Sequence, residues 1–80
     1  MITVNVALYA TLRKYRPDGG KGGSFRIDLP DGAPVAKLLE ILRVPRTQTK
    51  LVFVNNVDRE ADYVLQDEQK VAIFPPIAGG

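Results

Sequence analysis

A single helical pattern lies between two sets of strand-like segments, and this order restricts the fold of the 80-residue chain more than any other feature. Apolar residues recur at helical spacing until Pro45, and Pro34 suits the first helical position. The members of this pattern are Val35, Leu38, Leu39, Ile41 and Leu42. One helix cannot cover both faces of a four- to five-stranded sheet, so we expect an α+β domain with the helix packed on one face.

Strand patterns precede the helix. Residues 2–9 alternate apolar and polar side chains, as a half-buried strand does. A helical turn is expected at residues 10–15, and the glycine-rich segment 19–23 marks a loop. Residues 24–29 alternate again, which predicts a hairpin partner for the first strand.

Strand patterns also follow the helix. Residues 51–54 form a short apolar run that ends at Asn55-Asn56, a pair that tolerates the left-handed conformation of a tight turn. A brief strand is expected at residues 57–58. The final strand is expected at residues 70–74, where Pro75-Pro76 ends it. We therefore expect one domain over residues 1–74 and an extended tail over residues 75–80.

Composition excludes most chemistry by side chains. The chain has no cysteine and no histidine, so thiolate metal sites, cysteine nucleophiles and the commonest general base are absent. We expect a protein that is not an enzyme and that holds no metal. No apolar run approaches the roughly 20 residues of a membrane span, and no signal peptide is recognisable, so we expect a cytoplasmic protein without a membrane partner.

Charged and glycine-rich segments each have an ordinary interpretation. The segment around Lys21 lacks the spacing of a phosphate-binding loop and is interpreted as a hairpin loop. The carboxylates in residues 58–62 and 67–68 are expected to be solvated. The net charge is only +2 and aromatic residues do not alternate with the basic ones, so we expect no nucleic-acid binding and a solvated face. The basic residues concerned are Arg13, Lys14, Arg16, Arg43, Arg46 and Lys50.

The sequence ends in an unusual combination of stiff and small residues. Pro75-Pro76 favours an extended exit from the last strand, so the final six residues would project about 18 Å at about 3.1 Å per residue. Gly79 and Gly80 lack a Cβ and can thread a narrow tunnel in another protein. An ordinary frayed terminus is the alternative. We expect the tail to present the Gly80 carboxylate away from the domain.

These segments together resemble the MoaD/ThiS family, which contains the small subunit of molybdopterin synthase, the thiamin sulfur carrier and their relatives. The resemblance rests on the strand at residues 2–6, the helix at residues 35–40, the turn at residues 54–56 and above all the ending at residues 71–80. It implies a ubiquitin-like β-grasp fold with a mixed sheet. The diproline resembles the molybdopterin branch more than the thiamin branch.

The resemblance also implies a mechanism. An ATP-dependent adenylating enzyme of the ubiquitin-activating type would convert the Gly80 carboxylate to an acyl-adenylate, and a sulfur donor would replace AMP to leave a thiocarboxylate. A recipient enzyme, such as the molybdopterin synthase large subunit, would then take the sulfur. ATP and magnesium would belong to the activating partner, and no cofactor would be bound by this chain.

Partner docking is expected on the sheet face away from the helix. Alternation places Ala7, Ala72 and Phe74 on that face if their strand neighbours point inward. The parity of residues 51–54 is ambiguous from the pattern, and similarity to ubiquitin implies that Val52 and Val54 point outward. The expected partner-binding residues are Phe74, Pro75, Pro76, Ile77, Ala78, Ala7, Ala72, Val52 and Val54, with Gly79 and Gly80 at the reacting end.

Three functions remain open at this point. The first is a sulfur carrier for molybdenum or tungsten cofactor assembly, for thiamin or for another sulfur-containing metabolite. The second is a ubiquitin-like protein modifier that is conjugated through Gly80 to lysines. The third is an interaction module with an inert tail. Fold alone does not decide among them.

Overall fold

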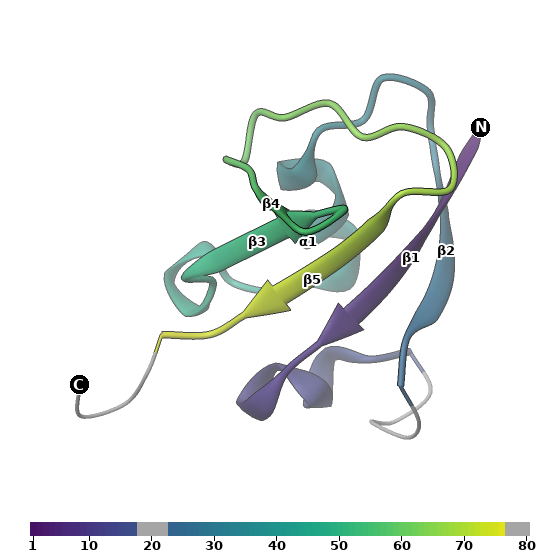
Figure 1. Cartoon of the computed structure of the whole chain (residues 1–80). Coiled ribbons are helices and arrows are strands. Elements are labelled where there is room, and N and C mark those ends of the chain that lie inside the picture. Colours follow the sequence, from purple (N-terminus) through teal and green to yellow (C-terminus); the bar gives the residue numbers. More distant parts are fainter. Residues whose placement is uncertain (18–22, 77–80) are drawn as a thin grey trace.

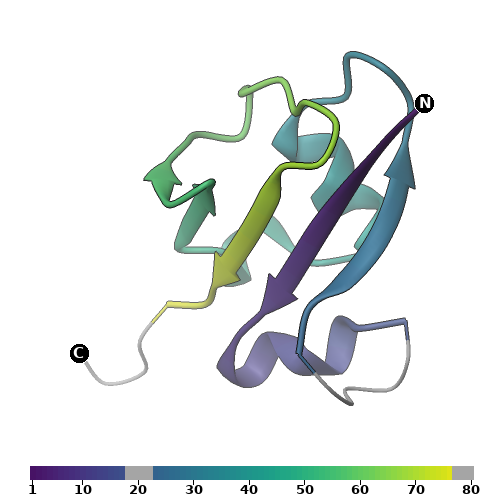
Figure 2. The same ribbon diagram turned by 45° about the vertical axis from the view of Figure 1, so that its right-hand side comes forward.

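A computed structural model describes residues 1–17 and 23–76 of the chain. They form one mixed five-stranded sheet with helix α1 behind it in the view of Figure 1, and Figure 2 shows the same arrangement from another direction. The elements are β1 (Ile2–Leu8), the 3₁₀ helix η1 (Ala10–Tyr15), β2 (Phe25–Leu29), α1 (Val35–Leu42), the 3₁₀ helix η2 (Arg46–Gln48), β3 (Leu51–Val54), β4 (Val57–Asp58) and β5 (Lys70–Phe74). The predicted α+β class, with one main helix on one face of the sheet, is confirmed.

The sheet is organised around a parallel pair of strands at its centre. The strand order is β2-β1-β5-β3-β4, and β1 and β5 run parallel, whereas every other neighbouring pair is antiparallel. Val6 pairs with Val71 and Leu8 pairs with Ile73, and all four side chains are buried. The expected pairing of the first two strands as an antiparallel hairpin is also confirmed.

The core lies between the sheet and α1. In the helix, Val35, Leu38, Leu39 and Leu42 are buried because the spacing i, i+3, i+4, i+7 places them on one stripe. Ile41 lies off that stripe and is exposed, so its predicted place on the buried face was wrong. The remaining buried apolar residues of the core are Val4, Val6, Leu8, Leu12, Leu29, Ala33, Val44, Val52, Val54, Leu65, Val71 and Ile73.

Local backbone conformations agree with the residues that adopt them. Asn55 and Asn56 have φ angles of 50° and 68°, as a two-residue hairpin turn requires, so the predicted turn is confirmed. Pro34 lies at the N-cap of α1, one residue before the predicted position, because it keeps an extended backbone. The predicted loop at residues 19–23 lies mainly outside the described residues. Within the part of the chain that the structure describes, no helix has the length and hydropathy needed to cross a membrane.

Ala10 provides a test of backbone strain. Its φ angle is 52°, in the left-handed region, which costs a non-glycine residue about 1–2 kcal/mol, while glycine adds about 0.5–1 kcal/mol of entropy loss on folding. We expect Ala10→Gly to raise the free energy of unfolding by about 0.5–1 kcal/mol in urea denaturation. The control Ala36→Gly, inside α1, is expected to lower it by about 1 kcal/mol. A loss of stability in Ala10→Gly would contradict this account.

Candidate functional site

The face of the sheet that α1 leaves uncovered is turned toward the viewer in Figure 1. Near the end of β5, strand pairing places apolar residues together on this face. Ala7 pairs with Ala72, and Ala72 in turn pairs with Phe53 on its other side. Since side chains alternate along each strand, these three share the face opposite the buried core. We call the group the outer patch, and its members are Ala7, Tyr9, Leu51, Phe53, Ala72 and Phe74.

Three aromatic rings of the outer patch hold the end of β5. The rings of Tyr9 and Phe74 are stacked, with centroids 4.5 Å apart and planes 7° apart. Phe53 meets Phe74 edge-on, with centroids 5.7 Å apart and planes 85° apart. Both arrangements are favourable for aromatic quadrupoles. Phe74, directly before Pro75-Pro76, therefore contacts a second aromatic ring on each side.

Backbone hydrogen bonds fix the same point of the chain. The N–H of Lys50 donates to the carbonyl oxygen of Phe74 over 2.8 Å, and the N–H of Tyr9 donates to that of Ile73 over 3.2 Å. The last residues of β5 are thus tied to β3 on one side and to the end of β1 on the other. The direction in which the chain leaves the sheet is set by both neighbours.

The opposite end of the uncovered face is polar. Arg26 donates two hydrogen bonds to the Glu68 carboxylate, at 3.2 and 2.8 Å. The hydrogen bond and the charge of Glu68 raise the pKa of Arg26 above its ordinary value. Thr3 donates to Asp28 through its hydroxyl and to Asp67 through its N–H. The apolar area is therefore confined to the end where the tail begins.

The predicted docking residues are only partly brought together. Ala7, Ala72 and Phe74 lie on the uncovered face, as predicted. The prediction that Val52 and Val54 point outward was wrong, because they pair with the inward-facing Ile73 and Val71 and are only 6% and 2% exposed.

The other two residues of β3, Leu51 and Phe53, take the outward positions. All four residues of this strand are apolar, so the sequence does not indicate which of them face the core and which face outward. Tyr9 was also missed, although its odd position continues the alternation that contains Ala7. That alternation was the signal from which it could have been found.

Arg16 was predicted to be solvated, but it is buried. Arg16 is 6% exposed, its guanidinium carbon lies 4.9 Å from the Phe25 ring centroid, and it donates a hydrogen bond to the Gly23 carbonyl. These contacts compensate for its burial. The predicted solvated face is correct for the other basic residues, which are exposed: Arg13, Lys14, Arg43, Arg46 and Lys50.

The tail itself is described only at its root. Pro75 is half-buried and Pro76 is exposed. The predicted site residues Ile77, Ala78, Gly79 and Gly80 lie outside the described residues. Over residues 1–17 and 23–76, no group of three or more side chains is arranged to hold a metal ion.

Comparisons with known proteins agree with this architecture. A sequence model described as the ThiS family matches residues 6–80. The structure is similar to a Pyrococcus furiosus protein assigned as subunit 1 of molybdopterin converting factor, with 24% identity, a TM-score of 0.75 and coverage of 96% of this chain and 100% of that one. A comparison with curated proteins found no match.

Two further solved structures share the fold. Small archaeal modifier protein 1 of Haloferax volcanii is 20% identical, with a TM-score of 0.75 and coverage of 96% of this chain and 100% of that one. A chain in the complex of subunits 1 and 2 of the Helicobacter pylori molybdopterin-converting factor is 17% identical, with a TM-score of 0.62 and coverage of 99% and 100%. These similarities confirm the predicted ubiquitin-like β-grasp fold.

The contribution of the two ring contacts of Phe74 to local stability can be tested by hydrogen exchange. Phe74→Ala removes both ring contacts, and we expect the Lys50 amide, which donates to residue 74, to exchange about tenfold faster or more, in keeping with about 1.4 kcal/mol of lost local stability. Leu51→Ala, on the same face but outside the ring contacts, serves as the matched control and is expected to leave this amide within about threefold. Equal effects of the two variants would exclude a special role for the rings.

Proposed function

Because the chain belongs to the ThiS family, we propose that it is a ubiquitin-like sulfur carrier whose Gly80 carboxylate is converted to a thiocarboxylate. One structural observation supports the proposal independently of the family. Strand β5, which leads into the tail, lies in the middle of the sheet and ends beside the outer patch that α1 leaves uncovered. A partner that covers the outer patch would receive the tail at a defined place.

The chemistry of the carboxylate explains why a partner is needed. An α-carboxyl group has a pKa of about 3.5 and is an anion at neutral pH, so sulfur nucleophiles do not attack it. Transfer of AMP from ATP, with release of pyrophosphate, would turn the carboxylate into an acyl-adenylate with a good leaving group. A sulfur donor at the oxidation level of hydrosulfide would then displace AMP and leave the thiocarboxylate.

The division of labour follows from the composition of the chain. With no cysteine and no histidine, it supplies neither a thiolate nucleophile nor the usual general base, and it acts as a carrier rather than an enzyme. ATP, magnesium and the catalytic groups would come from the adenylating partner. The stiff Pro75-Pro76 segment would lose less conformational entropy than a flexible one when the tail enters that partner's active site.

The recipient of the sulfur is proposed to be an enzyme of cofactor biosynthesis. The Helicobacter pylori structure contains subunits 1 and 2 of the molybdopterin-converting factor in a complex, which supports a large synthase subunit as the recipient for the present chain. A thiazole-forming enzyme of the thiamin pathway is the alternative recipient within the same chemistry.

Protein modification is the second candidate, and the similarity to the Haloferax volcanii modifier supports it. The same activated Gly80 would then form an isopeptide bond with lysines of other proteins. Lys70 is the last tryptic site of the chain, so lysines modified by it would carry residues 71–80 after trypsin digestion. Tryptic peptides with this remnant on lysine, recovered from conjugates that survive denaturation, would favour this function. Their absence together with formation of the thiocarboxylate would favour the carrier.

Intact-mass spectrometry tests the proposed reaction. Incubation with the cognate adenylating enzyme, ATP and a sulfur donor is expected to add the mass of one oxygen-to-sulfur exchange, located at Gly80 by fragmentation. An alanine appended after Gly80 is expected to abolish the exchange, because the glycine carboxyl group is then an amide. Exchange in the extended variant would refute the mechanism, whereas omission of ATP gives the baseline.

The docking surface can be tested separately from the tail. Ala72→Arg places a charge in the middle of the outer patch, and we expect kcat/KM of the adenylating enzyme for the carrier to fall at least about tenfold, because a charge would be buried against the partner. Ile41→Arg adds the same charge on the exposed side of α1 and is the control, with kcat/KM expected to stay within about twofold. Circular dichroism would confirm that both variants are folded. Equal rates for the two variants would place docking elsewhere.

A further inference from the structure

Strand β2 forms one border of the sheet. It lies at the end of the strand order, and Figure 2 shows it along the right-hand border. In the part of the chain that the structure describes, no strand pairs with its other side. Proteins often protect such an edge with lysine, proline or a bulge, but β2 contains neither residue and pairs with β1 in unbroken register. Its open side can therefore accept a strand of another molecule.

The hydrogen bonds of β1 show which backbone groups of β2 face outward. Thr3 and Asn5 bond through their backbone groups to residues 67–69, on the side away from β2. Because this direction alternates along a strand, the even-numbered residues of β1 bond to the odd-numbered residues of β2. The N–H and C=O groups of Arg26 and Asp28 therefore point away from the sheet, toward the open side.

Charge favours one register for a second copy of β2 on this edge. Antiparallel pairing centred on Ile27 places Arg26 of each copy directly opposite Asp28 of the other. A slip of two residues, which keeps the outward backbone groups facing one another, places Arg26 opposite Arg26 or Asp28 opposite Asp28. Opposite charges across an antiparallel pair contribute about 0.2–1 kcal/mol, whereas like charges are destabilising. The strand is thus complementary to itself in one register.

The side chains of β2 can form these contacts and keep those that they already have. Arg26 uses two of its N–H groups to hold Glu68, and a guanidinium has five. Asp28 accepts the Thr3 hydroxyl with Oδ1, which leaves Oδ2 for another donor. On the other face, Ile27 is only half-buried and would meet Ile27 of the second copy, with the two Cα atoms about 4.5 Å apart.

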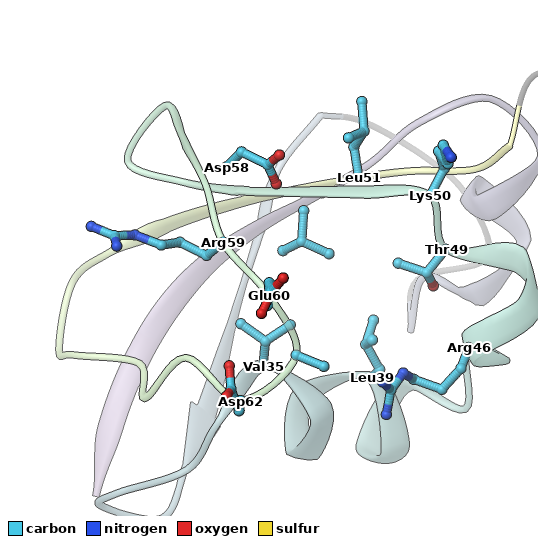
Figure 3. A pocket seen from close by; sticks show the side chains of 12 residues that line it. Val35, Leu39, Arg46, Thr49, Lys50, Leu51, Asp58, Arg59, Glu60 and Asp62 are labelled. Carbon is cyan, nitrogen blue, oxygen red and sulfur yellow. The ribbon is translucent and has the colours of Figure 1, made fainter.

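The opposite border of the sheet is less suited to such pairing. Strand β4 has only two residues. Figure 3 shows that Asp58, Glu60 and Asp62 follow one another there, beside a cleft between residues 58–62 and residues 46–52. A second copy placed along this border would bring carboxylates together, which is unfavourable. Strand β2 is therefore the border that favours self-association.

We propose that this chain forms a symmetric dimer by antiparallel pairing of β2 with β2 of a second copy, with Ile27 on the two-fold axis. Each Arg26–Asp28 pair then exchanges two backbone hydrogen bonds, and the two sheets become one. Five residues a side are far fewer than the roughly 20–30 of a standard interface, so the dimer is weak, with a Kd of about 0.1–1 mM.

The dimer is compatible with the proposed carrier function but does not depend on it. Strand β2 contributes no residue to the outer patch, so pairing through β2 leaves the patch of each copy uncovered. Antiparallel pairing also keeps both outer patches on the same face of the joined sheet, because residues directly opposite each other share a face. One dimer therefore presents two docking surfaces and two tails.

Single cysteines report the register directly, because the chain has none of its own. At about 1 mM protein, the scale of the expected Kd, in a glutathione redox buffer, we expect Ile27→Cys to form a disulfide-linked dimer, since the expected Cα separation is one that disulfides span. The controls Arg26→Cys and Asp28→Cys are more exposed, but each cysteine would lie roughly 9 Å from its counterpart. We expect at least about tenfold less dimer from either control. Preferred cross-linking at residue 26 or 28, or none at all, would overturn the proposal.

An exchange of charges tests the same register without cysteine. Arg26→Asp and Asp28→Arg each place like charges opposite one another, and we expect each variant alone to dimerise at least about tenfold more weakly in sedimentation equilibrium. An equimolar mixture of the two again places Asp opposite Arg at both pairs. Its Kd is expected to lie within about threefold of that of the parent protein.

Arg43→Asp and Glu60→Arg are the matched controls, since both residues are exposed and lie outside β2. They change the net charge by the same amounts, and each is expected to dimerise like the parent, alone or mixed. Circular dichroism would confirm that all four variants are folded. A parent protein that stays monomeric at 1 mM, no recovery in the mixture, or equal weakening in the controls would each refute the proposed dimer.

Discussion

The parallel pairing of β1 and β5 is the interaction on which the rest of the structure depends. Parallel neighbours cannot be joined by a tight turn, so the chain between them must form a long crossover. Here that crossover contains β2, α1, β3 and β4, and it places α1 over one face only. The last strand thus lies in the middle of the sheet, between β1 and β3, with a neighbour on each side to fix its end.

This placement connects the packing of the domain with its proposed function. Residues of β1 and β5 that face α1 belong to the core, and Ala7, Ala72 and Phe74 on the other side of the same strands belong to the outer patch. In the outer patch, Ala7 and Ala72 have small side chains that project little from the sheet. The larger rings of Tyr9, Phe53 and Phe74 project further, around the root of the tail. The central strands therefore contribute to the core on one face and to the proposed docking surface on the other.

Much of the fold could be predicted from residue patterns, and the parts that could not share a physical cause. The alternation in β1 and the stripe of Val35, Leu38, Leu39 and Leu42 each contain polar positions that identify the buried side. The apolar run of β3 contains none, so its side was assigned incorrectly. The predicted exposure of Arg16 was wrong because its guanidinium packs on the ring of Phe25, which belongs to the next strand. A periodic pattern within one segment does not report a contact with another segment.

The sequence by itself determined the one-helix α+β class, the order of the strands along the chain, the Asn55-Asn56 turn and the absence of cysteine and histidine. It also contains the diproline and diglycine ending on which the proposed chemistry rests. Only the tertiary structure decided that Val52 and Val54 face the core, that Tyr9 stacks on Phe74, and that residues 46–52 and 58–62 face each other across a cleft. The reason is that periodicity records which neighbours along the chain share a side, whereas register and long-range contacts depend on how separate segments pack together.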